Sequence, residues 1–178
     1  MKPAQEYNKK AVQLYEWFLR DFPKDEKVDQ ALFFLGYNYF ELNDEQKGMS
    51  YYERLTKEFP KSPYVDESNF AIGEFHFENE KWADALEYYK RVAQNRRARL
   101  YSFALYKSAW CEYKVGKTKD ALRSLERVIK AGRVAKGSEQ RTAGGVSRIR
   151  LATEALKDLV IFYAEVGSYK SARAYFDK

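Results

Sequence analysis

The strongest constraint on the fold of this chain is a sequence pattern that returns every 36 or 37 residues. Residues 15–24 read Tyr-Glu-Trp-Phe-Leu-Arg-Asp-Phe-Pro-Lys, and residues 52–61 read Tyr-Glu-Arg-Leu-Thr-Lys-Glu-Phe-Pro-Lys. A second match, between 31–37 and 104–110, has about twice that offset. A repeat of this length is one supersecondary unit that buries its apolar face against its neighbours. The sequence therefore predicts a stacked array of similar units.

Apolar residues within each unit follow helical spacing, as Leu32, Leu35, Tyr39 and Leu42 do. The Phe-Pro-Lys segments end helices, because proline has no N–H to donate and disfavours helix in the residue before it. Small residues recur in step and allow helices to approach closely, at Ala11, Gly48, Ala85, Ala121 and Ala172. The pattern predicts about nine helices, near residues 5–22, 27–42, 45–60, 64–79, 82–95, 99–115, 118–131, 147–166 and 169–177.

These residues resemble the tetratricopeptide repeat, a unit of two antiparallel helices called A and B. The resemblance covers nearly the whole chain, and residues 29–62 match the consensus spacing at Leu32, Leu35, Gly36, Tyr39, Gly48, Tyr52, Leu55 and Pro60. It implies an all-α fold, a right-handed α-solenoid of antiparallel helix pairs. The Phe-Pro-Lys ends and the stretch 105–111 are similar to bacterial envelope repeat proteins of the BamD and CpoB types.

The repeat boundaries suggest one array over residues 1–178. We expect helix B of a preceding repeat in 1–28, repeats in 29–65, 66–101 and 102–152, and a truncated repeat in 153–178. The third repeat carries an insertion at 131–147 with four glycines and a basic balance. This insertion is most simply a mobile loop, or a loop with a lengthened helix. Because the chain begins and ends in a helix B, we expect it to be a fragment of a longer array.

The formal charge is unevenly divided along the chain. Residues 1–89 hold 11 Lys/Arg and 18 Asp/Glu, whereas residues 90–178 hold 21 and 8. This asymmetry predicts an acidic partner for the second half or head-to-tail contact between copies, the alternative being two solvated faces of different sign. Nucleic acid is disfavoured, because no nucleic-acid motif is present and the first half would repel phosphate. The predicted basic surface consists of Arg96, Arg97, Arg99, Arg133, Lys136 and Arg141.

The resemblance also assigns helix A positions to a concave, partner-binding face. Nine of these fifteen positions are aromatic, and they are separate from the expected core positions. An aromatic groove of this kind would bind a peptide or helix of another protein, although the rings could instead pack against neighbouring helices. The predicted groove residues are Phe33, Tyr37, Phe40, Phe70, Glu74, Phe77, Phe103, Tyr106, Trp110 and Tyr113.

The sequence predicts no catalytic, metal or cofactor site. With one histidine, His76, and one cysteine, Cys111, a Cys/His zinc site and a disulfide framework are excluded. No glycine-rich phosphate loop is present, and no apolar run is long enough for a transmembrane helix. We therefore expect a protein that is not an enzyme.

These observations predict a protein-binding scaffold. The resemblance places it in a bacterial envelope or motility-related assembly, periplasmic or envelope-associated, where copies could also associate through uncapped terminal repeats. One alternative is a cytoplasmic adaptor that docks a regulatory GTPase or polarity and motility proteins. Another is a nucleic-acid-binding solenoid.

Overall fold

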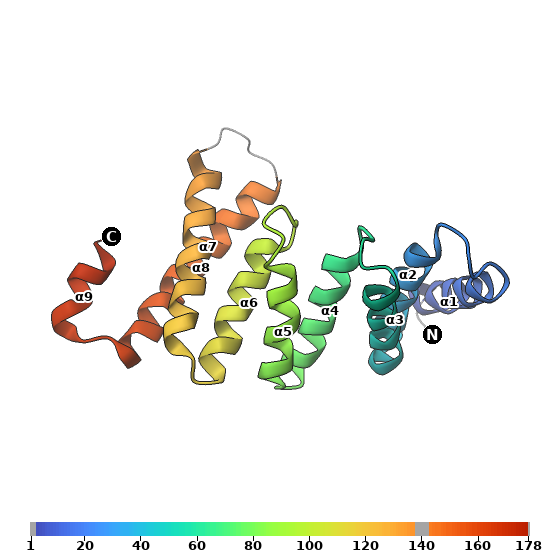
Figure 1. Cartoon of the computed structure of the whole chain (residues 1–178), viewed down its shortest axis with the longest axis horizontal. Helices are drawn as coiled ribbons and strands as arrows, with labels where there is room; N and C mark the ends of the chain where they lie inside the picture. Colours follow the sequence, from blue (N-terminus) through green and yellow to red (C-terminus); the bar gives the residue numbers. More distant parts are fainter. Residues whose placement is uncertain (1–2, 138–142, 178) are drawn as a thin grey trace. The chain divides into compact units, whose positions relative to one another are not determined.

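The computed structural model describes residues 3–137 and 143–177, with side chains described for 4–133 and 150–177. These residues form nine α-helices and no strand (Figure 1). The expected all-α solenoid of antiparallel helix pairs is confirmed. The helices are α1 (Pro3–Asp21), α2 (Val28–Glu41), α3 (Glu45–Glu58), α4 (Val65–Glu78), α5 (Trp82–Val92), α6 (Tyr101–Lys114), α7 (Thr118–Gly137), α8 (Ala143–Val166) and α9 (Tyr169–Phe176).

The helices group into two compact units. Unit 1 spans residues 1–79 and contains α1–α4, and unit 2 spans residues 80–178 and contains α5–α9. From α1 to α4 in unit 1 and from α5 to α8 in unit 2, helices that follow one another in sequence pack together, which is the arrangement expected of helical repeats. The expected repeat 66–101 consists of α4 from unit 1 and α5 from unit 2.

The core of unit 1 is built where α2 packs against α1 and α3. Leu32 and Leu55 are fully buried there, one from each helix of the α2–α3 pair. Glycine permits this close approach, because a Cβ at Gly36 would lie 2.5 Å from the Tyr52 ring. A Cβ at Gly48 would lie 2.5 Å from the ring of Phe40. The small residues of the repeat thus have the packing role that the sequence predicted.

Short connections join the paired helices. Asn43 adopts a left-handed backbone with φ of 61°, and the carboxylate of Asp44 then accepts a hydrogen bond from the Lys47 N–H at the start of α3. Gly116, with φ of 79°, makes the corresponding turn between α6 and α7. Glycine and asparagine tolerate this region of φ better than other residues.

The core of unit 2 lies among α6, α7 and α8. Leu105, Leu125 and Phe162 are almost completely buried in it, one from each helix. Fully buried alanines lie beside them at Ala109, Ala121 and Ala155, where larger side chains would separate the helices.

Most of the predicted insertion at 131–147 lengthens two helices. The helix expected to end at residue 131 continues to Gly137, and the helix expected at 147 begins at Ala143. An insertion that is entirely a mobile loop is therefore wrong, and the alternative with lengthened helix holds. The segment Arg133-Val-Ala-Lys contains no residue that must end a helix, so α7 continues through it. Residues 138–142, including Arg141, lie outside the described residues.

Candidate functional site

The predicted aromatic face of unit 1 begins on α2, where Phe33, Tyr37 and Phe40 follow one side of the helix. Phe33 stacks on Tyr64 with ring centroids 4.8 Å apart, and Phe40 lies 6.3 Å from Phe75 of α4. Tyr37, between them on the helix, is 49% exposed. The α2 face thus presents one open ring between two rings that are partly packed.

The α4 part of the predicted groove is less exposed. Phe70, Glu74 and Phe77 are all half-buried, and each already takes part in a contact. These residues share one side of α4 by their spacing. None of them is as exposed as Tyr37.

The predicted groove residues of unit 2 are engaged by α8. The Tyr106 hydroxyl donates a 2.7 Å hydrogen bond to Asp158 Oδ2, and Trp110 Nε1 donates a 3.1 Å hydrogen bond to the same oxygen. The Tyr113 hydroxyl donates to Glu165. This row of aromatic donors and carboxylate acceptors joins α6 to α8.

Ring packing reinforces this junction. Phe162 of α8 stacks on Tyr113 with centroids 4.0 Å apart and meets the Trp110 ring edge-on at 5.2 Å. Phe103, Tyr106, Trp110 and Tyr113 all pack against the core of unit 2. The expectation that the aromatic stripe is separate from the core is therefore wrong in this unit.

The environment keeps the α6 hydroxyls protonated. Burial raises the pKa of Tyr106 to about 12, and the hydrogen bond to Asp158 adds to the rise. The hydrogen bond to Glu165 also raises the pKa of Tyr113. Both hydroxyl groups therefore stay protonated, and remain hydrogen-bond donors across the α6–α8 junction, to a higher pH than an ordinary tyrosine.

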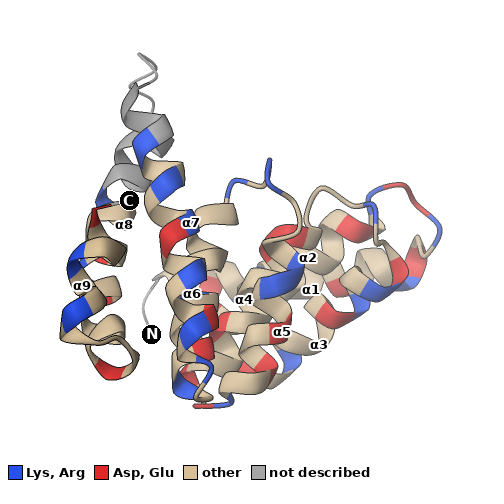
Figure 2. Cartoon of the chain, turned by 60° about the vertical axis from the view of Figure 1, so that its left-hand side comes forward, with Lys and Arg blue, Asp and Glu red and all other residues tan. Residues whose placement is uncertain are grey.

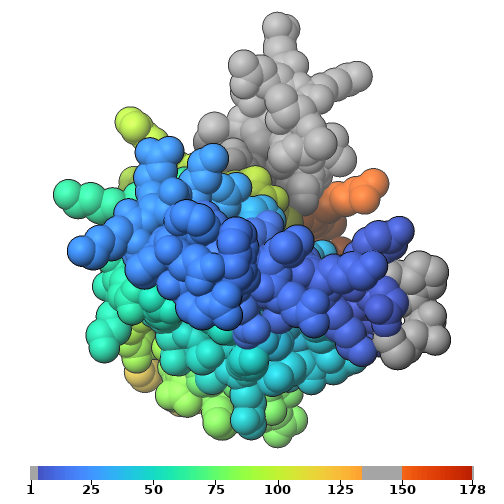
Figure 3. Space-filling view, turned by 90° about the vertical axis from the view of Figure 1, so that its right-hand side faces the viewer, coloured from blue at the N-terminus to red at the C-terminus, as the bar shows by residue number. Residues whose placement is uncertain are grey.

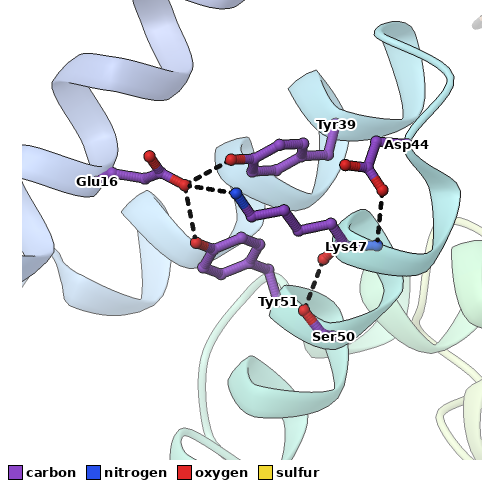
Figure 4. Close-up of polar contacts among 6 residues, drawn as sticks. All are labelled: Glu16, Tyr39, Asp44, Lys47, Ser50 and Tyr51. Carbon is purple, nitrogen blue, oxygen red and sulfur yellow. Dashed lines mark hydrogen bonds and ion pairs between the residues drawn. The ribbon is translucent and has the colours of Figure 1, made fainter.

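A second polar cluster, which the sequence did not predict, ties α1 to the α2–α3 pair (Figure 4). Glu16 Oε1 accepts hydrogen bonds from Tyr39 at 2.5 Å and from Tyr51 at 3.2 Å, and pairs with Lys47 Nζ at 3.1 Å. The Lys47 ammonium also lies 4.3 Å from the centroid of the Tyr39 ring. The two tyrosine rings stack with an interplanar angle of 8°. We call these four residues the Glu16 cluster.

Electrostatics favour the ionised form of Glu16. Burial alone would raise the pKa of this carboxyl group, but hydrogen bonds from Tyr39 and Lys47 and the Lys47 charge outweigh burial and lower it. Burial and the nearby carboxylate raise the pKa of Tyr51 to about 12. In the Glu16 cluster, a charged carboxylate of α1 thus interacts with three donors from α2 and α3. Such charge-assisted hydrogen bonds stabilise the packing of α1 on the α2–α3 pair.

The predicted basic surface is exposed where it is described. Arg96, Arg97 and Arg99 are exposed in the connection between α5 and α6, and Arg133 is exposed on α7. Figure 2 shows lysine and arginine in blue along the ribbon. Arg127 Nη2 donates a 3.0 Å hydrogen bond to the Tyr101 hydroxyl, which places the middle of α7 beside the start of α6. The side chain of Lys136 and the whole of Arg141 lie outside the described residues.

The histidine, the cysteine and the buried glutamate that a catalytic or metal site could use lie on packed helices of the repeats. His76 is half-buried on α4, and Cys111 is a buried cysteine on α6. Buried Glu112 accepts a 2.8 Å hydrogen bond from Ser124 and pairs with Lys90 at 3.0 Å. Within the described ranges, no group of His, Cys, Asp and Glu is arranged to hold a metal ion, and no helix is long and apolar enough to cross a membrane.

A comparison of the sequence with protein-family models agrees with the pairing of the helices. The family model of the tetratricopeptide repeat matches residues 30–62 and 103–131, which correspond to most of α2–α3 and α6–α7. Both matched segments therefore have the sequence pattern of the tetratricopeptide repeat. Repeats of this family are generally scaffolds that bind other proteins and do not catalyse reactions.

Solved structures share the fold of these tetratricopeptide repeats. A kinesin light chain-like protein of Podosopora anserina with nearly identical TPR-like repeats is 14% identical, with a TM-score of 0.63. That match covers 91% of this chain and 87% of the other. The MamA protein is 18% identical, with a TM-score of 0.58 and coverage of 92% and 88%. At these identities the likeness shows the fold alone.

No curated protein sequence matches this chain. The comparisons do not single out the BamD or CpoB types, so that part of the resemblance stays a prediction. Two segments match the tetratricopeptide repeat, and the binding partner of the protein is inferred from the surfaces of the two units.

Proposed function

We propose that this chain is a protein-binding scaffold that holds a segment of its partner against the aromatic face of α2 in unit 1. The observation that carries the proposal is the exposure of Tyr37 between Phe33 and Phe40. A partly exposed ring flanked by packed rings offers an apolar contact whose shape is already fixed, so little side-chain entropy is lost on binding.

The partner segment is expected to be a peptide or helix with an apolar side chain at its centre. Buried aromatic residues contribute most to binding at such contacts, roughly 2 kcal/mol or more for a central residue. The half-buried Phe70 and Phe77 of α4 extend the apolar surface of the unit. The α6 face of unit 2 contributes less, because α8 already engages its hydroxyl and indole groups.

A peptide selection followed by affinity measurements tests this function. Peptides would be selected from a random phage library on the immobilised chain, and the dissociation constant of the strongest binder measured by calorimetry. Tyr37→Ala is expected to weaken binding at least about tenfold. Tyr169→Ala is the matched control, because Tyr169 is 97% exposed and lies on α9. Circular dichroism checks that both variants are folded.

Equal affinity for the wild type and Tyr37→Ala would exclude the α2 face as the binding site. Loss of binding in both variants would show that recognition does not depend on Tyr37 in particular, which also contradicts the proposal.

The compartment we propose is the bacterial envelope, within a multiprotein assembly related to the outer membrane or to motility. Its support is the resemblance of the Phe-Pro-Lys ends and the 105–111 stretch to envelope repeat proteins. Fractionation of source cells with an antibody against the chain tests this placement. Recovery in the periplasmic or membrane fraction supports it, whereas recovery in the cytoplasm favours an adaptor for a GTPase or for polarity proteins.

A further inference from the structure

Positive charge is concentrated in unit 2 where the α5–α6 connection meets the second half of α7. We call this surface the basic corner, and all of its side chains are exposed. Three of them come from the connection and three from α7. Figure 2 shows the blue of the connection beside α7, and Figure 3 shows side chains near residue 100 (yellow-green) standing out at its upper left edge. The residues of the basic corner are Arg96, Arg97, Arg99, Arg127, Lys130 and Arg133.

One contact joins the two parts of the basic corner. Arg127 Nη2 donates a 3.0 Å hydrogen bond to the Tyr101 hydroxyl, and the guanidinium carbon lies 5.9 Å from the centroid of the Tyr101 ring. Tyr101 is the first residue of α6 and follows Arg99 by two positions. Lys130 and Arg133 follow Arg127 at intervals of three residues, so they share its side of α7. The cations of the two segments therefore belong to one surface.

Hydrogen bonds hold the α5–α6 connection in a defined turn. The Asn95 side chain accepts a 3.1 Å hydrogen bond from the Arg97 N–H, and the Ala98 N–H donates a 3.0 Å hydrogen bond to the Asn95 carbonyl. Ala98 is only 6% exposed and anchors the turn in the packed unit. Because the backbone is already ordered, a ligand that binds here has to order only the arginine side chains.

The basic corner contains no negative charge of its own. Residues 88–111 and 127–138 have no Asp or Glu. Glu126, the carboxylate nearest in sequence to Arg127, accepts a hydrogen bond from Tyr175 of α9. The like charges of the corner therefore add to a positive potential, and an anionic ligand would be attracted to it.

The basic corner also has no exposed apolar surface. No large apolar side chain of residues 80–133, all of which the structure describes, is exposed. A membrane or the apolar side of a helix would bury such side chains. Single-stranded nucleic acid would stack its bases on exposed rings, but Tyr101 is half-buried and its hydroxyl bonds Arg127. The chemistry of the corner therefore fits a hydrophilic anion.

The charge of unit 1 favours a short ligand over a long polyanion. Residues 1–79 hold 10 Lys/Arg and 15 Asp/Glu, so this unit would repel the phosphates of a nucleic acid. A short anionic segment needs to contact unit 2 alone.

We propose that the basic corner binds a short acidic segment of a partner protein, rich in Asp and Glu and without large apolar side chains. Five of the six cations are arginines, whose planar guanidinium groups bind a carboxylate through two parallel hydrogen bonds. Single exposed ion pairs are weak, so several carboxylates have to bind together. This segment differs from the apolar one proposed for Tyr37, and binding at the two surfaces can be measured, and can fail, independently.

Fluorescence anisotropy with a labelled peptide tests the proposal. The peptide has one Glu for each cation of the corner, separated by glycines, and a second peptide has Gln in place of every Glu. The variant Arg96→Gln/Arg97→Gln/Arg133→Gln removes three exposed cations and leaves the hydrogen bond between Arg127 and Tyr101 in place. Circular dichroism checks that it is folded.

The matched control is Lys24→Gln/Lys57→Gln/Lys61→Gln, which removes three exposed cations from unit 1 and changes the net charge equally. The wild type and this control are expected to bind the Glu peptide with similar affinity at low salt, and the Gln peptide is expected not to bind. The corner variant is expected to bind the Glu peptide about tenfold more weakly, because three ion pairs are lost. Tyr37→Ala is expected to bind it like the wild type.

A wild type that does not bind the Glu peptide at low salt overturns the proposal. Equal loss of affinity in the corner variant and the unit 1 control also overturns it, since the effect would then come from net charge alone. Tighter binding of a single-stranded oligonucleotide or of vesicles with anionic lipid, lost in the same corner variant, would assign the basic corner to another class of partner and contradict the proposal.

Discussion

The aromatic faces of α2 and α6 have the same repeat positions but different surroundings. Phe33 and Tyr37 correspond to Tyr106 and Trp110. In unit 2 the next helix A offers Asp158, which accepts hydrogen bonds from both aromatic groups. In α4 of unit 1 that position holds Ala71, and Tyr37 stays exposed. The comparison teaches that one carboxylate on the neighbouring helix decides whether a repeated aromatic face is a core or a surface.

The largest effect is expected from removing the carboxylate that closes the α6 face. Asp158→Ala removes the acceptor of two hydrogen bonds, and it is expected to lower the free energy of unfolding by about 2–3 kcal/mol, since bonds to a charged acceptor are among the stronger ones. Urea denaturation followed by circular dichroism measures the change. The matched control is Glu154→Ala on the same helix, whose exposed ion pair with Lys157 contributes little. Equal effects of the two substitutions would contradict the comparison.

A smaller effect is expected from the Glu16 cluster in unit 1. Glu16→Gln keeps the size of the side chain but removes the charge that Lys47, Tyr39 and Tyr51 surround. Because this carboxylate is partly exposed, the loss is expected to be only about 1 kcal/mol at neutral pH. Urea denaturation at pH 7 measures it, and Glu53→Gln, at an exposed position of α3, is the control.

The pH dependence of this difference follows from the lowered pKa of Glu16. A carboxyl group whose pKa is lower in the folded protein contributes stability above its unfolded pKa, here near 4.5, and loses it as the pH falls through the folded value. The wild type is therefore expected to exceed Glu16→Gln in stability at neutral pH and to approach it in acid. A difference that stays constant down to strong acid would contradict the assignment of charge to Glu16.

The smallest effect is expected from building the unit 2 contact into unit 1. Phe33→Tyr with Ala71→Asp places a hydroxyl and a carboxylate at the positions of Tyr106 and Asp158. A double-mutant cycle is expected to give a favourable coupling of about 0.5 kcal/mol between the two substitutions. Strictly additive effects would show that the two units differ in more than these residues.

The helices could be predicted from the sequence because the features that determine them lie close together in the sequence. Apolar spacing and the Phe-Pro-Lys segments place most helix ends within a few residues of those observed, and Gly36 and Gly48 indicate the close packing of α2 on α3. The sequence does not decide the lengthening of α7 and α8, because the glycines of that segment are compatible with both a loop and a helix.

The polar contacts of the site could not be predicted in the same way. Trp110 and Asp158 are 48 residues apart, and Glu16 and Tyr51 are 35 apart. Each pair meets only after helices from different repeats have packed, and the repeat consensus gives no sign of such pairs. The sequence therefore locates the aromatic positions but does not tell which of them remain exposed.

Hydroxyl-radical footprinting of the folded chain, read by mass spectrometry, tests the central claim most directly, because it reports the solvent exposure of individual aromatic rings. The account predicts fast oxidation of Tyr37 and protection of Tyr106 and Trp110, with the protection reduced in Asp158→Ala. Equal oxidation of Tyr37 and Tyr106 in the wild type would contradict the account.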